Sequence, residues 1–240
     1  MYPIVMVSNF SGNVGKTTIT KSLLAPNMLD VRIFAVEDVN AGYGQGEAVQ
    51  LSAEQTASIL EQVIEASLGA PVIVDVGASN VSNFFAALAG YDGMHEYISA
   101  VVVPTEPSDK VQTDTVSTLD YLINNLLFDA NKISLVLNKV PGKIPAATIF
   151  AKTLEHAEKM GVRSAGEIPE SETFQVAAAL GKTIHELSEL NPKELLAQSR
   201  VDSEAGKDPK AGVKMMLAAA SAKKLRTKLD EVFMALCLEG

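Results

Sequence analysis

The chain has 240 residues, of which 47% are hydrophobic, so it can bury a sizeable core as one large domain or two small ones. Its formal net charge is −9, which argues against strong nucleic-acid binding over the whole surface, because affinity for phosphate backbones accumulates from Lys and Arg side chains. The single cysteine, Cys237, excludes an internal disulfide, and no apolar run approaches the roughly 20 residues that span a bilayer.

The amino-terminal residues lack the charged start, long apolar core and cleavage site of a signal peptide. Together with the lone cysteine, which fits a reducing compartment, this indicates a cytoplasmic protein without a transmembrane segment. Cys237 ends an apolar helical pattern, where we expect it to be buried.

The predicted elements alternate between strand and helix along the chain. Continuous runs of Val, Ile and Leu are typical of strands covered on both faces. The pattern therefore predicts an α/β fold with a doubly wound, mostly parallel sheet and helices on both faces. The expected strands are 4–7, 31–36, 72–74, 98–103, 133–137 and 165–168, and the expected helices are 19–25, 51–68, 80–90, 109–128, 146–160, 173–180, 183–198 and 213–237.

The most informative stretch follows the first strand and reads Ser11-Gly12-Asn13-Val14-Gly15-Lys16-Thr17-Thr18. A strand, a glycine-bearing loop, Gly-Lys-Thr and a helix form the layout of a phosphate-binding P-loop. Lys16 would reach the outer phosphates of a nucleotide, and the Thr17 hydroxyl would hold Mg²⁺. The usual pattern has a further glycine where this chain has Phe10, so a chance Gly-Lys-Thr at a strand-to-helix turn is the alternative.

Polar residues end three of the predicted strands. Asp38, Asp75 and Asn138 would face the same edge as the P-loop, because ligands bind beyond the carboxyl ends of parallel strands. Asp75 suits a water-mediated partner of Mg²⁺, and Asp38 could hold Mg²⁺ or the attacking water. The Asn138 amide offers the donor and acceptor needed to read the edge of adenine. The alternative for each is an ordinary strand-end or turn residue.

Further landmarks follow the P-loop in a characteristic order. These landmarks are Val-Glu-Asp at 36–38, Val-Ile-Val-Asp at 72–75, Val-Val-Val-Pro-Thr-Glu-Pro at 101–107, Val-Leu-Asn-Lys at 136–139, Gly-Glu-Ile-Pro-Glu-Ser at 166–171 and Ala-Leu-Gly-Lys-Thr-Ile at 179–184. Over roughly residues 3–190, the P-loop and these landmarks resemble the ParA/MinD group of deviant Walker ATPases and, within that group, most nearly the StbB-type plasmid stability proteins.

The resemblance implies a switch that binds ATP or ADP with Mg²⁺, forms a homodimer with ATP, hydrolyses it slowly and positions plasmids, chromosomes or protein assemblies. Lys16, Asp38 and Asp75 match its catalytic positions. Thr17 matches the Mg²⁺ ligand, with Asp38 and Asp75 beside it. Pro104 and Asn138 match positions near the adenine, and a DNA-binding adaptor protein is the implied partner.

One departure from the family pattern concerns charge. The family has an extra lysine early in the P-loop that reaches the phosphates of the partner subunit, and this chain has Ser11 there. Charge stabilisation of this kind is commonly worth orders of magnitude in rate. We therefore expect weak or absent hydrolysis unless another Lys or Arg, or a partner, supplies the charge. Asn13 replaces a family glycine, and we expect it to weaken nucleotide binding by crowding the loop.

The end of the chain carries a basic cluster of Lys223, Lys224, Arg226 and Lys228. The resemblance implies that basic residues in this region contact DNA without sequence preference, and such binding would fall steeply with salt. The alternative is a solvated helix face. We expect residues 1–240 to form a single P-loop domain, in which 199–212 is a loop and the last helix follows.

Three functions are compatible with these features. The first is an ATP-binding switch with weak ATPase activity in plasmid stability, segregation or positioning. The second is a catalytically impaired adaptor that links a DNA-bound partner to the cell. The third is a small-molecule kinase or ligase on the same fold, for which the sequence identifies no substrate pocket.

Overall fold

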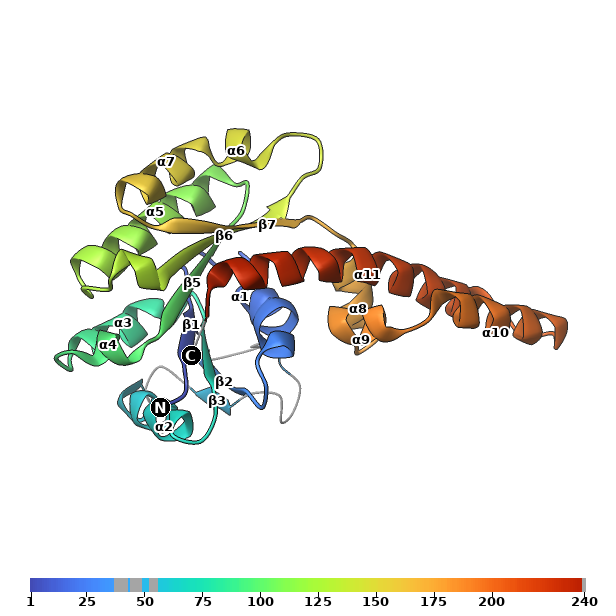
Figure 1. The fold of residues 1–240 in the computed structure, drawn as a ribbon, viewed down its shortest axis with the longest axis horizontal. Coiled ribbons are helices and arrows are strands. Elements are labelled where there is room, and N and C mark those ends of the chain that lie inside the picture. The colour runs from blue at the N-terminus through green and yellow to red at the C-terminus, as the bar shows by residue number, and fades with distance from the viewer. Residues whose placement is uncertain (37–42, 44–48, 52–55, 239–240) are drawn as a thin grey trace. The chain divides into compact units, whose positions relative to one another are not determined.

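The computed structural model describes residues 1–36, 43, 49–51 and 56–238. In these residues a seven-stranded sheet forms the centre of the fold, with the strand order β3-β2-β4-β1-β5-β6-β7 (Figure 1). Every neighbouring pair of strands is parallel, which confirms the predicted α/β class. The strands are β1 (Ile4–Val7), β2 (Arg32–Val36), β3 (Val49–Leu51), β4 (Val72–Val76), β5 (Ala100–Thr105), β6 (Ile133–Val140) and β7 (Arg163–Pro169).

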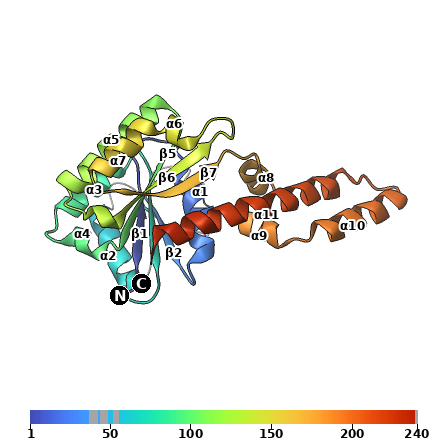
Figure 2. The ribbon, with the colours of Figure 1, turned by 45° about the horizontal axis from the view of Figure 1, so that its top comes forward.

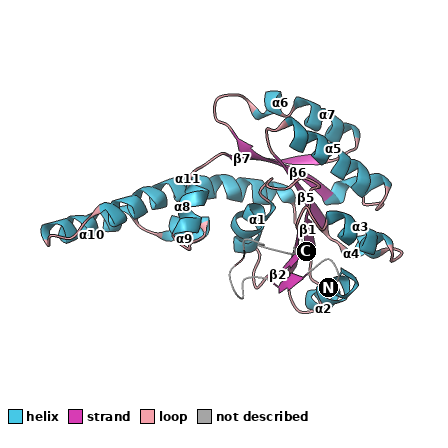
Figure 3. Ribbon diagram, turned by 180° about the vertical axis from the view of Figure 1, so that it is seen from behind, coloured by secondary structure: helices cyan, strands magenta, loops and turns pink. Residues whose placement is uncertain are grey.

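Helices cover both faces of this sheet. Figures 2 and 3 show α3, α5 and α7 on one side of the strands and α1 on the other. The first helix continues beyond α1 as a π-helical segment over Thr20–Leu24 and a 3-10 turn over Ala25–Asn27. The helices before residue 170 are α1 (Lys16–Ile19), α2 (Thr56–Ser67), α3 (Val81–Ala89), α4 (Met94–Tyr97), α5 (Asp109–Asn124), α6 (Ala146–Ile149) and α7 (Ala151–Lys159).

Alternate residues of each strand enter different layers, as the period of two along a strand requires. Ile4 and Met6 of β1 belong to the large core beneath α2, α3, α5 and α7, which also contains the fully buried Phe84 and Phe85. The opposite face of β1 carries Val5 and Val7, which are equally buried. Burial on both faces explains why the strands read as continuous apolar runs.

The chain divides by its internal contacts into two compact units, residues 1–170 with 232–240, and residues 171–231. The second unit contains α8 (Thr173–Ala179), α9 (Ile184–Glu189), α10 (Pro192–Glu204) and most of α11 (Lys210–Leu236). The single-domain organisation stays a prediction. No described helix combines the length and apolar composition needed to cross a membrane.

The expected loop over 199–212 is wrong at its start, because α10 continues to Glu204. No Gly or Pro occurs between Pro192 and Gly206, and Gly206 has a φ of 76° where the helix has ended. The expected helix over 183–198 is interrupted by Asn191, which caps α10 by accepting a hydrogen bond from the Lys193 N–H. Only the segment 205–209 is left between α10 and α11.

The last residues of α11 belong to the first unit. Val232 and Leu236 are buried, and a Cβ at Gly166 of β7 would come within 3.3 Å of the Val232 side chain. The Arg163 guanidinium donates to the Leu236 carbonyl at 2.5 Å. Cys237, which follows the helix with a φ of 49°, is exposed, so the expectation that it is buried is wrong.

Candidate nucleotide site

The strand order brings the P-loop and Asp75 together. β1 lies between β4 and β5, and Val7 at the end of β1 is level with Asp75 on β4. The Thr17 hydroxyl, in the first turn of α1, donates to Asp75 Oδ2 at 3.0 Å. The loop that connects β1 to α1 therefore lies at the carboxyl edge of the sheet, where parallel α/β folds bind ligands.

Two left-handed residues shape the loop. Gly15 has a φ of 87° directly before α1, and Asn13 has a φ of 59°. A Cβ at Gly15 would overlap the Asn138 side-chain nitrogen, so both the backbone angle and the available space require glycine. Asn adopts left-handed angles more readily than most residues, which explains how the chain accommodates Asn13 where the family has glycine.

Lys16 lies along the loop. Its ammonium donates to the carbonyls of Ser11 at 2.8 Å and Asn9 at 3.3 Å, and the residue is only 7% exposed. A positive charge therefore sits against the loop, and the positive end of α1 adds to the same field. This arrangement favours an anion at the loop.

Asn9, which the sequence analysis did not single out, holds the start of the loop. It is fully buried, and its amide donates to the Pro104 carbonyl at 2.8 Å and to the Thr115 hydroxyl at 2.9 Å. Its oxygen accepts from the Ser11 N–H at 2.7 Å. The available signal was a polar residue two positions after a buried strand. Pro104 contributes to the site through this carbonyl.

Helix α5 contacts the loop through neighbouring side chains. The Thr118 hydroxyl accepts from the Phe10 N–H at 3.1 Å, and Asp114 accepts from the Ser11 hydroxyl at 2.8 Å. Asp114 also pairs with Lys110 at 2.9 Å. The Phe10 ring lies edge-on to the rings of Phe85 and Tyr121, so the residue that breaks the usual P-loop pattern packs against the core.

Asp75 is 4% exposed, and burial raises the pKa of its carboxyl group above the ordinary range. Hydrogen bonds from the Tyr43 hydroxyl, at 2.7 Å, and from Thr17, together with the charge of Lys16, act in the opposite direction. A cation would offset the cost of burying the ionised form.

The donor set fits Mg²⁺. Mg²⁺ prefers hard oxygen ligands, and the Thr17 hydroxyl and the Asp75 carboxylate supply two of them. These two oxygens lie 3.0 Å apart because they share a hydrogen bond. The third predicted metal position, Asp38, lies outside the described residues. In the described part of the chain, no group of three or more His, Cys, Asp or Glu side chains is arranged to hold a metal.

Asn138 and Lys139 reach the loop from β6. The pairing of β6 with β7 is irregular between Leu137 and Val140, and Lys139 has a φ of 52°. The Asn138 amide donates to the Val14 carbonyl at 2.8 Å, and the Lys139 ammonium donates to the Asn13 carbonyl at 2.6 Å. The position predicted near adenine therefore also contacts the P-loop backbone.

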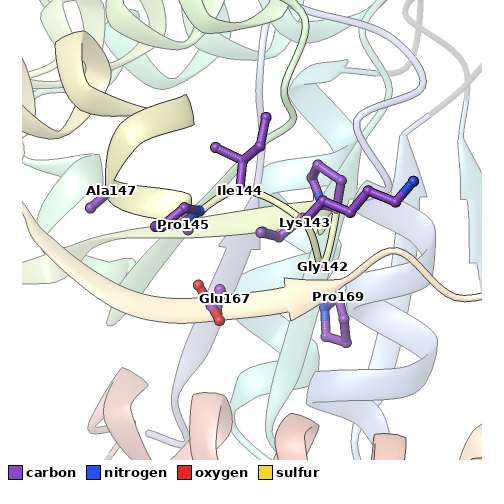
Figure 4. Close-up of a pocket in the computed structure, with 10 residues that line it drawn as sticks. Gly142, Lys143, Ile144, Pro145, Ala147, Glu167 and Pro169 are labelled. Carbon is purple, nitrogen blue, oxygen red and sulfur yellow. The ribbon is translucent and has the colours of Figure 1, made fainter.

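A pocket of about 590 Å³ lies beyond Asn138 and Lys139. It is formed by the loop after β6 and the end of β7, and its lining is mostly apolar apart from Lys143 and Glu167. Figure 4 shows Lys143, Ile144 and Pro145 on the loop and Glu167 on the strand beside them. This pocket could not be predicted from the sequence, because its residues form no recognisable motif.

The basic cluster is partly neutralised within the second unit. Arg226 pairs with Asp230 at 2.6 Å, and Lys228 pairs with Glu231 at 3.0 Å. Lys223 and Lys224 are exposed.

No protein-family model and no curated protein sequence matches the chain. Solved structures do match it over nearly its whole length. An ATP complex of McdA from Cyanothece is 16% identical over 93% of this chain and 96% of that one, with a TM-score of 0.51. The ParA of pNOB8 is 11% identical over 95% and 98%, with a TM-score of 0.54. MinD from Aquifex aeolicus is 13% identical over 91% and 97%, with a TM-score of 0.50.

The chain has the ParA/MinD fold. This confirms the fold that the resemblance implied. The identities are too low to carry over a function, and the narrower likeness to StbB-type stability proteins stays a prediction.

Proposed function

We propose that the protein is an ATP-binding switch with weak ATPase activity that acts in plasmid stability, segregation or positioning. The observation that carries the proposal is the P-loop with Lys16 against its backbone and the Thr17 hydroxyl 3.0 Å from Asp75. The similarity to McdA, ParA and MinD structures supports the same assignment.

In this proposal the loop backbone and Lys16 bind the phosphates, and Thr17 and Asp75 hold Mg²⁺, with Asp38 as a third predicted position. When bound, Mg²⁺ would neutralise part of the phosphate charge. Lys16 would stabilise charge on the outer phosphates. Pro104 and Asn138 are the proposed neighbours of the adenine.

We propose weak hydrolysis because of the surroundings of Ser11. Its hydroxyl donates to the Asp114 carboxylate, so a negative group is bound where the family pattern has a lysine. The cation nearest to Asp114 is Lys110, whose side chain is 80% exposed and paired with that carboxylate. Ser11 carries no charge, and Lys110 is exposed. Neither residue therefore offers the buried positive charge that accelerates phosphoryl transfer.

The proposed assembly is a cytoplasmic homodimer formed with ATP, working with a DNA-binding adaptor protein. Non-specific DNA contact would rest on Lys223 and Lys224, because Arg226 and Lys228 are paired with acidic residues. The acidic net charge limits DNA binding to such a local patch.

The experiment is solution mass by light scattering with Mg·ATP, with Mg·ADP and without nucleotide. We expect a dimer with Mg·ATP only, and its loss in Thr17→Val, which keeps the side-chain shape but removes the hydroxyl. Lys152→Met, at an exposed position outside the P-loop and the pocket, is the control and should dimerise normally. A monomer in all three states would reject the switch.

A catalytically impaired adaptor is the second candidate, and the contact between Ser11 and Asp114 favours it. An unchanged monomer that still binds a DNA-bound partner protein would support the adaptor. A small-molecule kinase or ligase is a third candidate, favoured by the pocket beside Pro141–Pro145. Turnover of ATP only in the presence of a small acceptor would identify it.

A further inference from the structure

Two consecutive side chains of β6 hold two consecutive carbonyl groups of the P-loop. Asn138 donates to the Val14 carbonyl at 2.8 Å, and Lys139 donates to the Asn13 carbonyl at 2.6 Å. The irregular pairing of β6 around these residues directs both side chains to the same loop. The match of two adjacent donors with two adjacent acceptors sets the orientation of this part of the loop.

The orientation of the carbonyls determines that of the N–H groups. In a trans peptide the C=O and the following N–H point in opposite directions. The Asn13 carbonyl points at Lys139 and the Val14 carbonyl points at Asn138, so the N–H groups of Val14 and Gly15 point to the other side. Among the residues that the structure describes, neither of these N–H groups has a protein acceptor. Such N–H groups are the donors with which a P-loop binds phosphate.

We propose that Asn138 and Lys139 are positioning residues that orient the N–H groups of Val14 and Gly15 for phosphate binding. The inference rests on the proposed nucleotide binding and assigns a role to Lys139 that the P-loop motif does not contain. In this role, the amide nitrogen of Asn138 donates to the P-loop carbonyl of Val14. A hydrogen bond to the adenine base would be a separate role of the same side chain, and ligands with and without a base distinguish the two.

The surroundings of Lys139 fit this role. Its ammonium also pairs with Glu106 at 2.5 Å, and Glu106 follows β5, the neighbour of β6 in the sheet. The pair fixes the direction of a side chain that is 43% exposed. Lysine is uncommon at a φ of 52°, where glycine is favoured, so the contact of the ammonium explains why a lysine occupies the position.

Gly15 supplies a further argument for a close fit. The Asn138 nitrogen occupies the space that a Cβ at Gly15 would need. Asn138 itself is 3% exposed. The asparagine therefore reaches its loop carbonyl only because the residue beside that carbonyl is glycine.

The experiment measures the affinity of the full chain for Mg·ATP and for inorganic triphosphate by isothermal titration calorimetry. Inorganic triphosphate has no base, so only phosphate binding contributes. We expect Lys139→Met and Asn138→Leu each to lower the affinity for both ligands by about 10- to 100-fold, because each variant loses a hydrogen bond to the loop. Lys139→Arg should restore most of the affinity, since Arg also donates to a carbonyl.

Two further variants keep the result interpretable. Lys139→Gly suits the left-handed backbone and lacks only the side chain, so it should fold and still bind triphosphate weakly. Lys152→Met removes an exposed positive charge from α7, outside the P-loop and the pocket, and should change neither affinity, which excludes a general effect of net charge.

The outcomes separate the two proposals. Wild-type affinity for triphosphate in folded Lys139→Gly and Lys139→Met would overturn the role of Lys139. If Asn138→Leu lowers the affinity for Mg·ATP but leaves the affinity for triphosphate unchanged, Asn138 acts on the base. That result would overturn its role on the loop. A wild-type protein that binds neither ligand would reject the proposed nucleotide function itself, and with it the positioning role.

Discussion

At the scale of single residues, the site is determined by neighbours that the P-loop motif does not contain. Asn9, Asp114 and Lys139 hold the loop from three directions. The motif identified the loop, Lys16 and Thr17, because their spacing along the chain is local. It did not identify Asn9, which precedes the motif, or Asp114 and Lys139, which lie on α5 and β6 and reach the loop only through the fold.

The first prediction concerns Asp75, whose pKa is raised by burial. A carboxyl group with a raised folded-state pKa stabilises the fold below its unfolded-state pKa, and this contribution is lost as the pH rises through the folded-state pKa. Without Mg²⁺, the Tm of the wild type should therefore fall relative to that of Asp75→Asn as the pH rises above the ordinary Asp value of 3.8. Asp75→Asn should remove this part of the pH dependence, as measured by thermal unfolding at a series of pH values.

Mg²⁺ provides the matching test, because a cation stabilises the ionised carboxylate. Added MgCl₂ should raise the Tm of the wild type more at higher pH and should leave Asp75→Asn unchanged. Asp92→Asn, at an exposed position, is the control. The same pH dependence in the wild type and Asp75→Asn would contradict the prediction.

The second prediction concerns the position of the missing lysine. A lysine introduced by Ser11→Lys would meet the Asp114 carboxylate that now accepts from the serine hydroxyl. We expect the ATPase rate of Ser11→Lys to change little, because the new charge pairs with Asp114. Ser11→Lys combined with Asp114→Ala should be at least about 10-fold faster, since the freed lysine can stabilise phosphate charge.

Steady-state phosphate release measures these rates, with Asp114→Ala alone as the control. Equal rates for the single Ser11→Lys variant and the double variant would show that Asp114 does not restrain a lysine there.

At the scale of elements, α5 is the helix that ties the P-loop to the rest of the first unit. Thr118 lies four residues after Asp114 and three after Thr115, and these spacings place its side chain beside both of theirs on the helix surface. The apolar pattern predicted this helix and most others, because core-facing residues repeat with a helical period. It could not predict β3, whose three residues carry no period, or the interruption of α6–α7 at Phe150.

The third prediction tests this connection. Thr118→Val keeps the shape of the side chain but leaves the Phe10 N–H without its acceptor, which should lower the free energy of unfolding by about 1–3 kcal/mol. Thr113→Val is the matched control, because Thr113 is exposed and its hydroxyl bonds only within the helix. Its effect should stay within about 0.5 kcal/mol. Urea unfolding measures both, and equal losses would contradict the prediction.

At the scale of the whole molecule, an acidic protein carries a basic cluster that is smaller than its sequence indicates. The order of charges along α11 identified the four residues, but it could not show that Asp230 and Glu231 pair with two of them. The paired side chains are three or four residues apart, which is contact distance on a helix.

The fourth prediction follows from this pairing. Binding of duplex DNA, measured by fluorescence anisotropy at several salt concentrations, should be weak and should depend mainly on Lys223 and Lys224. Replacing both with Ala should reduce the slope of log affinity against log salt by about 2, roughly one per lysine. Arg226→Ala should change the slope much less, because Arg226 is paired with Asp230. A larger loss from Arg226→Ala would reverse this assignment.

The path of α11 has a consequence for how the protein is made. Val232 and Leu236 pack in the first unit, beside Gly166 and Arg163 of a strand that is synthesised some 70 residues earlier. A nascent chain therefore cannot complete this unit until α11 has left the ribosome. A chain that stops before Val232 would contain the P-loop and all seven strands but would lack the part of α11 that lies beside β7.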